Sequence, residues 1–109
     1  MTGREVLEQA AGLLGYGQPS DWCDSRGLLF VNKIAEELWD YTGEEGYLPV
    51  SSPDEALPPL AREQALPFGV AMLLAQASGD GDNQALYGEL YDRRRAAGLP
   101  GERRDVLPR

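Results

Sequence analysis

The chain has 109 residues and a mass of 11.9 kDa, a length that suits one domain and leaves no room for a second hydrophobic core. Hydrophobic residues make up 42% of it and charged residues 26%, so the composition supports a folded core rather than a disordered chain. No histidine is present, which excludes His-based acid–base catalysis, Ser-His and Cys-His nucleophile pairs and imidazole metal ligands. The single cysteine, Cys23, excludes an internal disulfide and a Cys-rich zinc site.

The net charge of −8 is divided unevenly along the chain. Residues 1–92 hold 16 acidic and four basic groups, a net −12, whereas residues 93–109 hold two acidic and six basic groups, a net +4. Binding to nucleic acid needs positive charge that displaces counterions from phosphates, so the acidic part argues against general affinity for DNA or RNA. The sequence therefore predicts an acidic body with a basic C-terminal arm.

The N-terminal residues contain no uninterrupted apolar run and no convincing signal-peptide cleavage site. The longest apolar-rich stretch, 65–77, includes Pro67 and Gln76 and is too short to cross a bilayer. We therefore expect a soluble protein made in the cytoplasm, where one reduced thiol is stable, and no membrane partner.

Two helices are expected in the first 41 residues. Thr2 and Glu5 have the spacing of a capping box, and apolar residues then recur at helical intervals up to Gly15, which predicts a helix over 3–14. A turn-forming segment over 15–19 follows. Ser20 or Asp21 can cap a second helix over 21–41, with its apolar stripe at Cys23, Gly27, Phe30, Val31, Ile34, Leu38 and Tyr41.

A long connection follows over residues 42–58. Its glycines and prolines exclude a long helix. Tyr47 to Val50 is compatible with a short extended piece or half of a β-ribbon, although Pro49 keeps it off a central strand. A connection of this length in a compact domain is often a binding loop, and its composition suits a mobile loop equally well.

The remaining helices lie on either side of a Gly-Asp turn at 79–82. Pro58 can open a short helical turn that runs to Gln64, and Pro67 is either a kink or the first position of a helix that ends at Ala77. This helix is apolar on all sides, so we expect it at the centre of the fold, where a second subunit is a candidate cover for part of its surface.

A final amphipathic helix is expected over 82–97. Asp80 or Asp82 caps it and Gly98 ends it, and its apolar residues are Ala85, Leu86, Leu90 and Ala97 with Tyr87 and Tyr91. The last residues contain two prolines and no periodicity. The predicted fold is thus all-α, a small bundle of about four helices over 1–97 with a long Pro/Gly-rich central loop and a flexible, extended basic arm over 98–109.

The densest acidic cluster comprises Glu36, Glu37, Asp40, Glu44 and Glu45. It is open to three interpretations: a solvated acidic face, a surface that binds a partner or repels DNA, and a carboxylate pair for hydrolysis, which would need environments that separate their pKa values. The Asp80 turn resembles the start of a calcium loop, but Ala85 and Tyr91 occupy the places that need Gly and Glu. No metal and no cofactor are expected.

The C-terminal arginines are the strongest candidates for a binding site. One interpretation is complementarity to the helix dipole together with solubility, and a second is an arm that pairs with carboxylates on a neighbouring protein. A third is contact with nucleic acid, which the acidic body disfavours because it would repel phosphates. The guanidinium fork binds carboxylates bidentately, and apolar residues among the arginines would anchor such an arm. The predicted partner-binding residues are Arg93, Arg94, Arg95, Leu99, Arg103, Arg104, Val106 and Leu107.

The order of these features resembles the small head-to-tail adaptor (connector, or head-completion) proteins of tailed bacteriophages and prophages. The resemblance spans roughly residues 3–97 and is carried by the opening helix 3–14, by Val31-Asn32-Lys33-Ile34-Ala35-Glu36-Glu37-Leu38-Trp39, by Leu66-Pro67-Phe68-Gly69-Val70-Ala71-Met72-Leu73-Leu74-Ala75 with Gly79-Asp80, and by the helix 83–97 with Tyr87 and Tyr91.

The resemblance implies a helical virion structural protein that is not an enzyme. Such proteins form a ring, typically twelvefold, beneath the portal, dock on the portal through their C-terminal segments, and pass DNA through the lumen. It implies a docking arm at 98–109 and a loop 42–58 that faces a tail component or the lumen. The protein would act in the host cytoplasm during assembly and then at the head–tail junction of the virion.

Two other functions stay open from the residues alone. One is a small acidic protein–protein interaction or regulatory module of a mobile element, which predicts a stable small oligomer without affinity for a portal. The other is an enzyme that uses carboxylates only, which needs a cleft holding two of Glu36, Asp40, Glu44 and Glu45. An isolated adaptor is expected to be a monomer or a small oligomer, since the portal often templates the ring.

Overall fold

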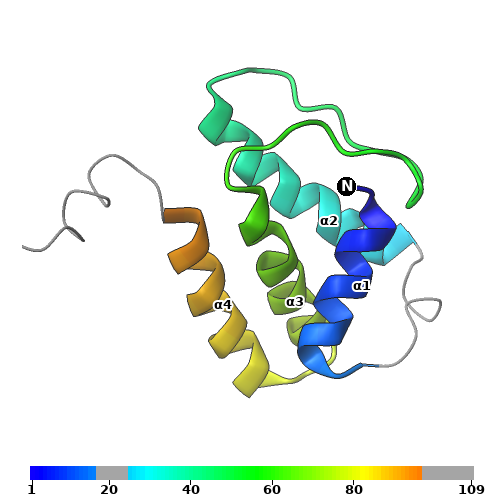
Figure 1. The fold of residues 1–109 in the computed structure, drawn as a ribbon. Coiled ribbons are helices and arrows are strands. Elements are labelled where there is room, and N and C mark those ends of the chain that lie inside the picture. Colours follow the sequence, from blue (N-terminus) through cyan, green and yellow to red (C-terminus); the bar gives the residue numbers. More distant parts are fainter. Residues whose placement is uncertain (17–24, 97–109) are drawn as a thin grey trace, which may run out of the picture.

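The computed structural model describes residues 1–16 and 25–96 (Figure 1). These residues form four α-helices, α1 (Gly3–Leu14), α2 (Ser25–Trp39), α3 (Leu66–Ala77) and α4 (Gly81–Ala96), and two 3-10 turns, η2 (Asp40–Thr42) and η3 (Glu63–Ala65). The predicted all-α class is confirmed. The predicted caps Ser20 and Asp21, the single Cys23 and the arm 98–109 lie outside the described residues.

Helix α1 begins and ends as its sequence predicts. The backbone N–H of Glu5 donates to the Thr2 hydroxyl, and the Glu5 carboxylate accepts from the Thr2 backbone N–H, which completes the capping box. Gly15 closes the helix in the left-handed region, with φ 73°. The cap of α4 is Asp80 rather than Asp82, because Asp80 accepts from the backbone N–H of Asn83.

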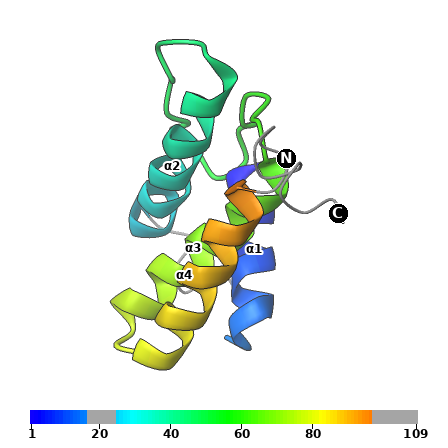
Figure 2. The same ribbon diagram turned by 90° about the vertical axis from the view of Figure 1, so that its left-hand side faces the viewer.

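Helix α3 is the central element, as its apolar composition predicts. It packs against α1, α2 and α4; Figure 1 shows it between α1 and α4, and in Figure 2 α4 lies in front of it. The main core includes Val6, Leu7, Ala10, Val31, Ile34, Leu38, Leu66, Val70, Leu74 and Tyr91. Helices of the same chain therefore cover most of α3. Phe68 and Met72 are only partly buried, so the predicted contact of α3 with a second subunit stays a prediction.

The predicted apolar face of α4 is confirmed only in part. Tyr91 is buried and Tyr87 packs against the core, as predicted, whereas Ala85 and Leu86 are exposed and Leu90 is only partly buried. The reason is close packing against α3: a Cβ on Gly88 would lie 3.2 Å from the Met72 sulfur, so the glycine rather than a leucine faces α3. Tyr87 and Tyr91, which flank this glycine in the sequence, both pack against the core.

The ends of two predicted elements also differ from the structure. Helix α2 stops at Trp39, and the chain tightens into η2, which closes at Gly43 with φ 79°. The helical turn predicted from Pro58 begins later than expected: residues 57–60 are not helical, and the chain turns at 61–62, directly before η3. Pro58 precedes Pro59, and a residue before proline prefers extended backbone, which explains the delay.

The predicted extended piece from Tyr47 to Val50 joins no strand. Within the described residues the sheet-like pairing is an isolated antiparallel bridge between Thr2 and Ala56. Among the same residues, no helix combines the length and apolar composition needed to cross a bilayer.

Candidate protein-binding surfaces

The three adjacent arginines at the end of α4 make three different contacts. Arg93 pairs with Glu89 at 2.6 Å on the helix surface and is 71% exposed. The guanidinium carbon of Arg94 lies 4.6 Å from the centroid of the Phe68 ring, a cation–π contact with α3. Arg93 and Arg94 are therefore exposed, and of the two only Arg94 contacts Phe68.

Arg95 instead fastens α4 to α2. Its guanidinium lies 3.4 Å from the Glu37 carboxylate, 2.8 Å from Asp92 and 4.7 Å from the centroid of the Tyr91 ring. The Tyr91 hydroxyl donates to Glu37 at 2.7 Å, and burial, together with this carboxylate, raises the pKa of Tyr91 above its ordinary value. Of the predicted binding residues, Arg95 is thus engaged within its own chain. Leu99, Arg103, Arg104, Val106 and Leu107 lie outside the described residues.

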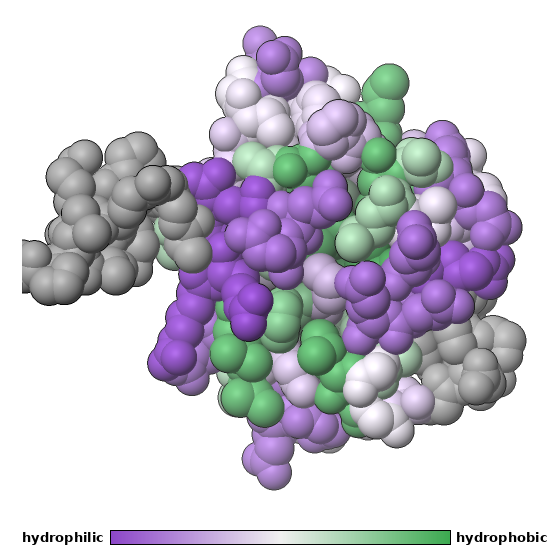
Figure 3. Space-filling view, viewed as in Figure 1, coloured by the Kyte–Doolittle hydropathy of each residue, from purple (hydrophilic) through white to green (hydrophobic). Residues whose placement is uncertain are grey.

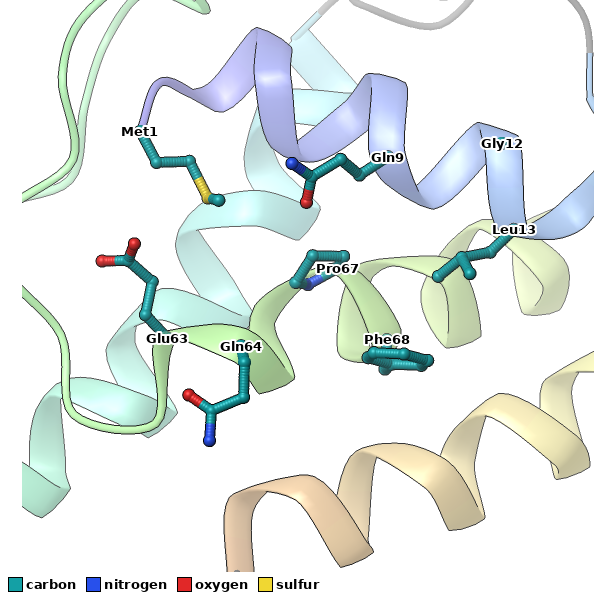
Figure 4. Close-up of a pocket in the computed structure, with 8 residues that line it drawn as sticks. All are labelled: Met1, Gln9, Gly12, Leu13, Glu63, Gln64, Pro67 and Phe68. Carbon is teal, nitrogen blue, oxygen red and sulfur yellow. The ribbon is translucent and has the colours of Figure 1, made fainter.

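A groove of about 740 Å³ runs between α1 and the start of α3 (Figure 4). Leu13 from α1 and Phe68 from α3 point toward each other at one end, and Glu63 lies toward the other (Figure 4). The Tyr87 hydroxyl donates to the Leu13 carbonyl at 2.7 Å beside Phe68, which joins α4 to this end. The α1–α3 groove is lined by Met1, Gln9, Gly12, Leu13, Glu63, Gln64, Pro67 and Phe68.

The groove has an apolar part, formed by Met1, Leu13, Pro67 and Phe68, beside polar lining residues. Leu13 is 37% exposed and Met1 is 40% exposed, although both are large hydrophobic residues. Figure 3 shows hydrophobic surface between the hydrophilic side chains over α4 and those over α1. A recessed apolar surface with polar residues around it is typical of a protein- or peptide-binding site.

The long loop before α3 is held on α2 by one amide side chain. The Asn32 oxygen accepts from the Tyr47 hydroxyl at 2.8 Å and from the Val50 backbone N–H at 3.0 Å, and its nitrogen donates to the Val50 carbonyl at 2.9 Å. Burial, and then the charges of Glu36 and Glu55, raise the pKa of Tyr47 to about 12. Asn32 thereby satisfies both backbone groups of the buried Val50.

A second set of contacts ties the loop to the start of α1. The Arg4 backbone N–H donates to the Pro53 carbonyl at 2.8 Å, and the Leu57 N–H donates to the Met1 carbonyl at 2.9 Å. The Arg4 guanidinium hydrogen-bonds Asp54 at 2.7 Å, and this bond and the adjacent positive charge lower the pKa of that carboxyl. The described loop is therefore anchored at both halves.

Leu48 projects from the first half of this anchored loop. Its neighbour Tyr47 and the nearby Val50 are fixed by Asn32, yet Leu48 itself is 80% exposed. The acidic residues Glu44 and Glu45 precede it and are also exposed. Neither the exposure of Leu48 nor the groove was predicted from the sequence. One signal was present: Leu13 is an apolar residue that lies outside the apolar stripe of α1, which indicates apolar surface away from the core.

The predicted acidic cluster divides into two kinds of residue. Glu37 is bound by Tyr91 and Arg95, whereas Glu36, Asp40, Glu44 and Glu45 are exposed. The structure thus places these four carboxylates on the surface of α2, η2 and the loop that follows. Within residues 1–16 and 25–96, no three Asp, Glu, Cys or His side chains are grouped so that they could hold a metal ion.

No family model matches the chain, and no curated protein or solved structure matches it either. Its function is therefore inferred from its own residues and their geometry.

Proposed function

We propose that this protein is a non-enzymatic head-to-tail adaptor of a tailed bacteriophage or prophage. It assembles as a ring on the portal, links the portal to the tail, and lets DNA pass without binding it specifically. The observation that carries the proposal is an acidic helical body whose last helix ends in Arg93, Arg94 and Arg95, in the element order that resembles this family.

The surface charge of the described body supports a role beside DNA rather than on it. Glu36, Asp40, Glu44 and Glu45 are exposed on α2 and the adjacent loop, where they repel phosphates. Repulsion between exposed charges extends over about 10 Å at 0.1 M salt, so a carboxylate-rich surface can face a DNA channel without retaining the DNA.

The end of α4 supports a docking role for the residues that follow it. Arg95 holds this end against α2 through Glu37, and α4 also contacts η3. Residues 97–109 therefore continue from a fixed point on the body. Their cations and apolar residues suit a carboxylate-bearing partner such as the portal, in line with the family resemblance.

The closed core supports a protein that folds before it assembles. The buried side chains of α1, α2 and α3 pack on one another within a single chain. The described surface nevertheless keeps an apolar groove and an exposed leucine. A folded subunit with such surfaces is suited to join a ring that the portal templates.

Binding to the portal protein encoded in the same prophage genome tests the proposal. We expect the full chain to co-sediment with portal rings, and deletion of residues 98–109 to weaken binding by at least about tenfold. Circular dichroism of the shortened chain checks that the helices are kept. Equal binding by the shortened chain would contradict the arm, and a stable small oligomer with no affinity for portal rings would favour the regulatory module instead.

A further inference from the structure

Of two apolar features on the described surface, one projects and the other is recessed. Leu48 projects from its loop, and the α1–α3 groove is recessed between Leu13 and Phe68. Leu48 does not line the groove of its own chain, and Asn32 ties its loop to α2. We infer that the Leu48 loop (residues 43–49) of one copy docks in the α1–α3 groove of a second copy.

The Leu48 loop is organised for docking before any partner arrives. The Tyr47 hydroxyl and the Val50 backbone, on either side of Leu48, are hydrogen-bonded to Asn32, and the Tyr47 ring lies 6.1 Å from that of Trp39. Ordering a loop on binding costs free energy, and an anchored loop avoids much of that cost. Leu48 itself is 80% exposed, so its side chain contributes little to the folding of its own chain.

The charges around the two surfaces are also complementary. Glu44 and Glu45 precede Leu48, and Arg94 lies over Phe68 at the α4 side of the groove with Arg93 next to it. These arginines would thus meet carboxylates on a neighbouring protein, and that neighbour is a second copy of the same chain. Opposite charges at the rim select the partner and steer its approach.

The single acidic residue of the groove lining sets the direction of docking. Glu63 lies at the end of the groove away from Leu13 and Phe68 (Figure 4), so the two glutamates of the loop are favoured at the opposite, arginine-bearing end. On α2, Lys33 and Glu36 both line the hollow beside Pro49, so their opposite charges give that side of the loop no preference. The position of Glu63 relative to the arginine-bearing end therefore favours one orientation of the loop.

A loop that fits a groove elsewhere on the molecule makes a head-to-tail contact. Such a contact repeats from copy to copy and gives a ring when the rotation closes. The inference rests on the ring of the proposed function and names its subunit contact. It concerns the contact between copies only, and it does not depend on what residues 98–109 bind.

Two complementary variants of the full chain test this contact. Leu48→Asp removes the projecting side chain, and Leu13→Asp places a charge in the groove. Sedimentation at concentrations up to about 1 mM should show self-association of the unaltered chain, weakened at least tenfold in each variant. Leu86→Asp is the matched control, because Leu86 is 48% exposed on α4 and does not line the groove.

Mixing the two variants gives the decisive result. The intact loop of Leu13→Asp fits the intact groove of Leu48→Asp, so the mixture should form a 1:1 dimer that does not grow further. Circular dichroism checks that each variant is folded. The readout is the methyl resonances of Met1 and Leu13 in the Leu48→Asp variant, whose groove is intact. If these resonances do not shift when the Leu13→Asp variant is added at about 1 mM, the inference is wrong.

Two other occupants of the groove are distinguishable by the same resonances. If the Met1 and Leu13 signals of the dilute full chain change when residues 98–109 are deleted, the groove holds that segment, and the inference is wrong. If they change only with added portal protein, the groove holds the portal, and the inference is again wrong. A dimer of the two variants without portal affinity would instead uphold the contact and remove the adaptor function.

Discussion

Gly69 lies on α3 where side chains from α2 and α4 meet it. A Cβ at this position would lie 2.7 Å from Ile34 Cγ2 and 3.0 Å from Tyr91 Cδ1, so something must move to admit a methyl group. Overpacking of this kind costs about 1–3 kcal/mol. We expect Gly69→Ala to lower the free energy of unfolding by this amount, which a lower urea midpoint of unfolding would show.

Gly12 provides the matched control on α1. It is an exposed helical glycine, and a Cβ added to it would have no other atom within 4 Å, so the methyl group meets open space. Alanine in a helix is favoured over glycine by roughly 0.5–1 kcal/mol. Gly12→Ala should therefore stabilise the protein slightly, and equal destabilisation by the two substitutions would contradict the proposed packing at Gly69.

Asn32 is the residue on which the ordered loop depends. Asn32→Ala removes three hydrogen bonds and leaves the Val50 backbone N–H and carbonyl without their partner. Burial of such groups unpaired costs about 1–3 kcal/mol. We expect a loss of this size in the free energy of unfolding and faster hydrogen exchange at Val50, whereas alanine at the exposed Lys33 should change neither.

The hydroxyl of Tyr47 makes stability depend on alkaline pH. Its pKa is raised from 10.0 to about 12 in the folded protein, so above pH 10 the unfolded chain loses this proton first. The contribution of Tyr47 to stability is complete below pH 10 and falls as the pH rises toward 12. In urea unfolding across this pH range, the free energy of unfolding should fall less steeply with pH for Tyr47→Phe than for the unaltered chain. An equal dependence on pH would contradict the partial burial of the Tyr47 hydroxyl.

At the scale of secondary-structure elements, local signals in the sequence were enough for α1 and α3. The Thr2–Glu5 capping box and Gly15 give the ends of α1, and the unbroken apolar run after Pro67 gives the central position of α3. Both depend on residues within one or two turns of each other. Element type and position follow from such local chemistry.

The parts that could not be predicted depend on contacts between distant residues. The face of α4 is decided by how closely Gly88 approaches Met72, which the periodicity of α4 alone does not encode. The loop is ordered by Asn32, which is 18 residues from Val50 in the chain. The α1–α3 groove likewise forms only when Leu13 and Phe68 come together.

The contact of Arg95 with α2 gives a prediction for the end of α4. Its partner Glu37 is partly exposed, so the ion pair contributes little to global stability. Its loss should instead act locally: Arg95→Ala is expected to speed hydrogen exchange in the last turn of α4. Arg93→Ala is the control, since Arg93 pairs within α4 with Glu89, and an equal effect of both would contradict the link to α2.

At the scale of the whole molecule, a closed core is combined with open association surfaces. The four helices bury one another within the chain, while Leu48, the groove and Arg93 stay at the surface. We have proposed that the acidic body does not hold DNA and that the basic end binds protein. The proposed ring subunit around a DNA channel depends on this combination.

Titration of purified portal rings with the full chain tests the central claim most directly. Native mass spectrometry would count the bound copies as the concentration of the chain rises. The adaptor account predicts saturation at one copy per portal subunit, with the copies arranged as a ring at the tail-facing end in electron micrographs. Absence of binding, or saturation at a single copy per portal ring, would contradict it.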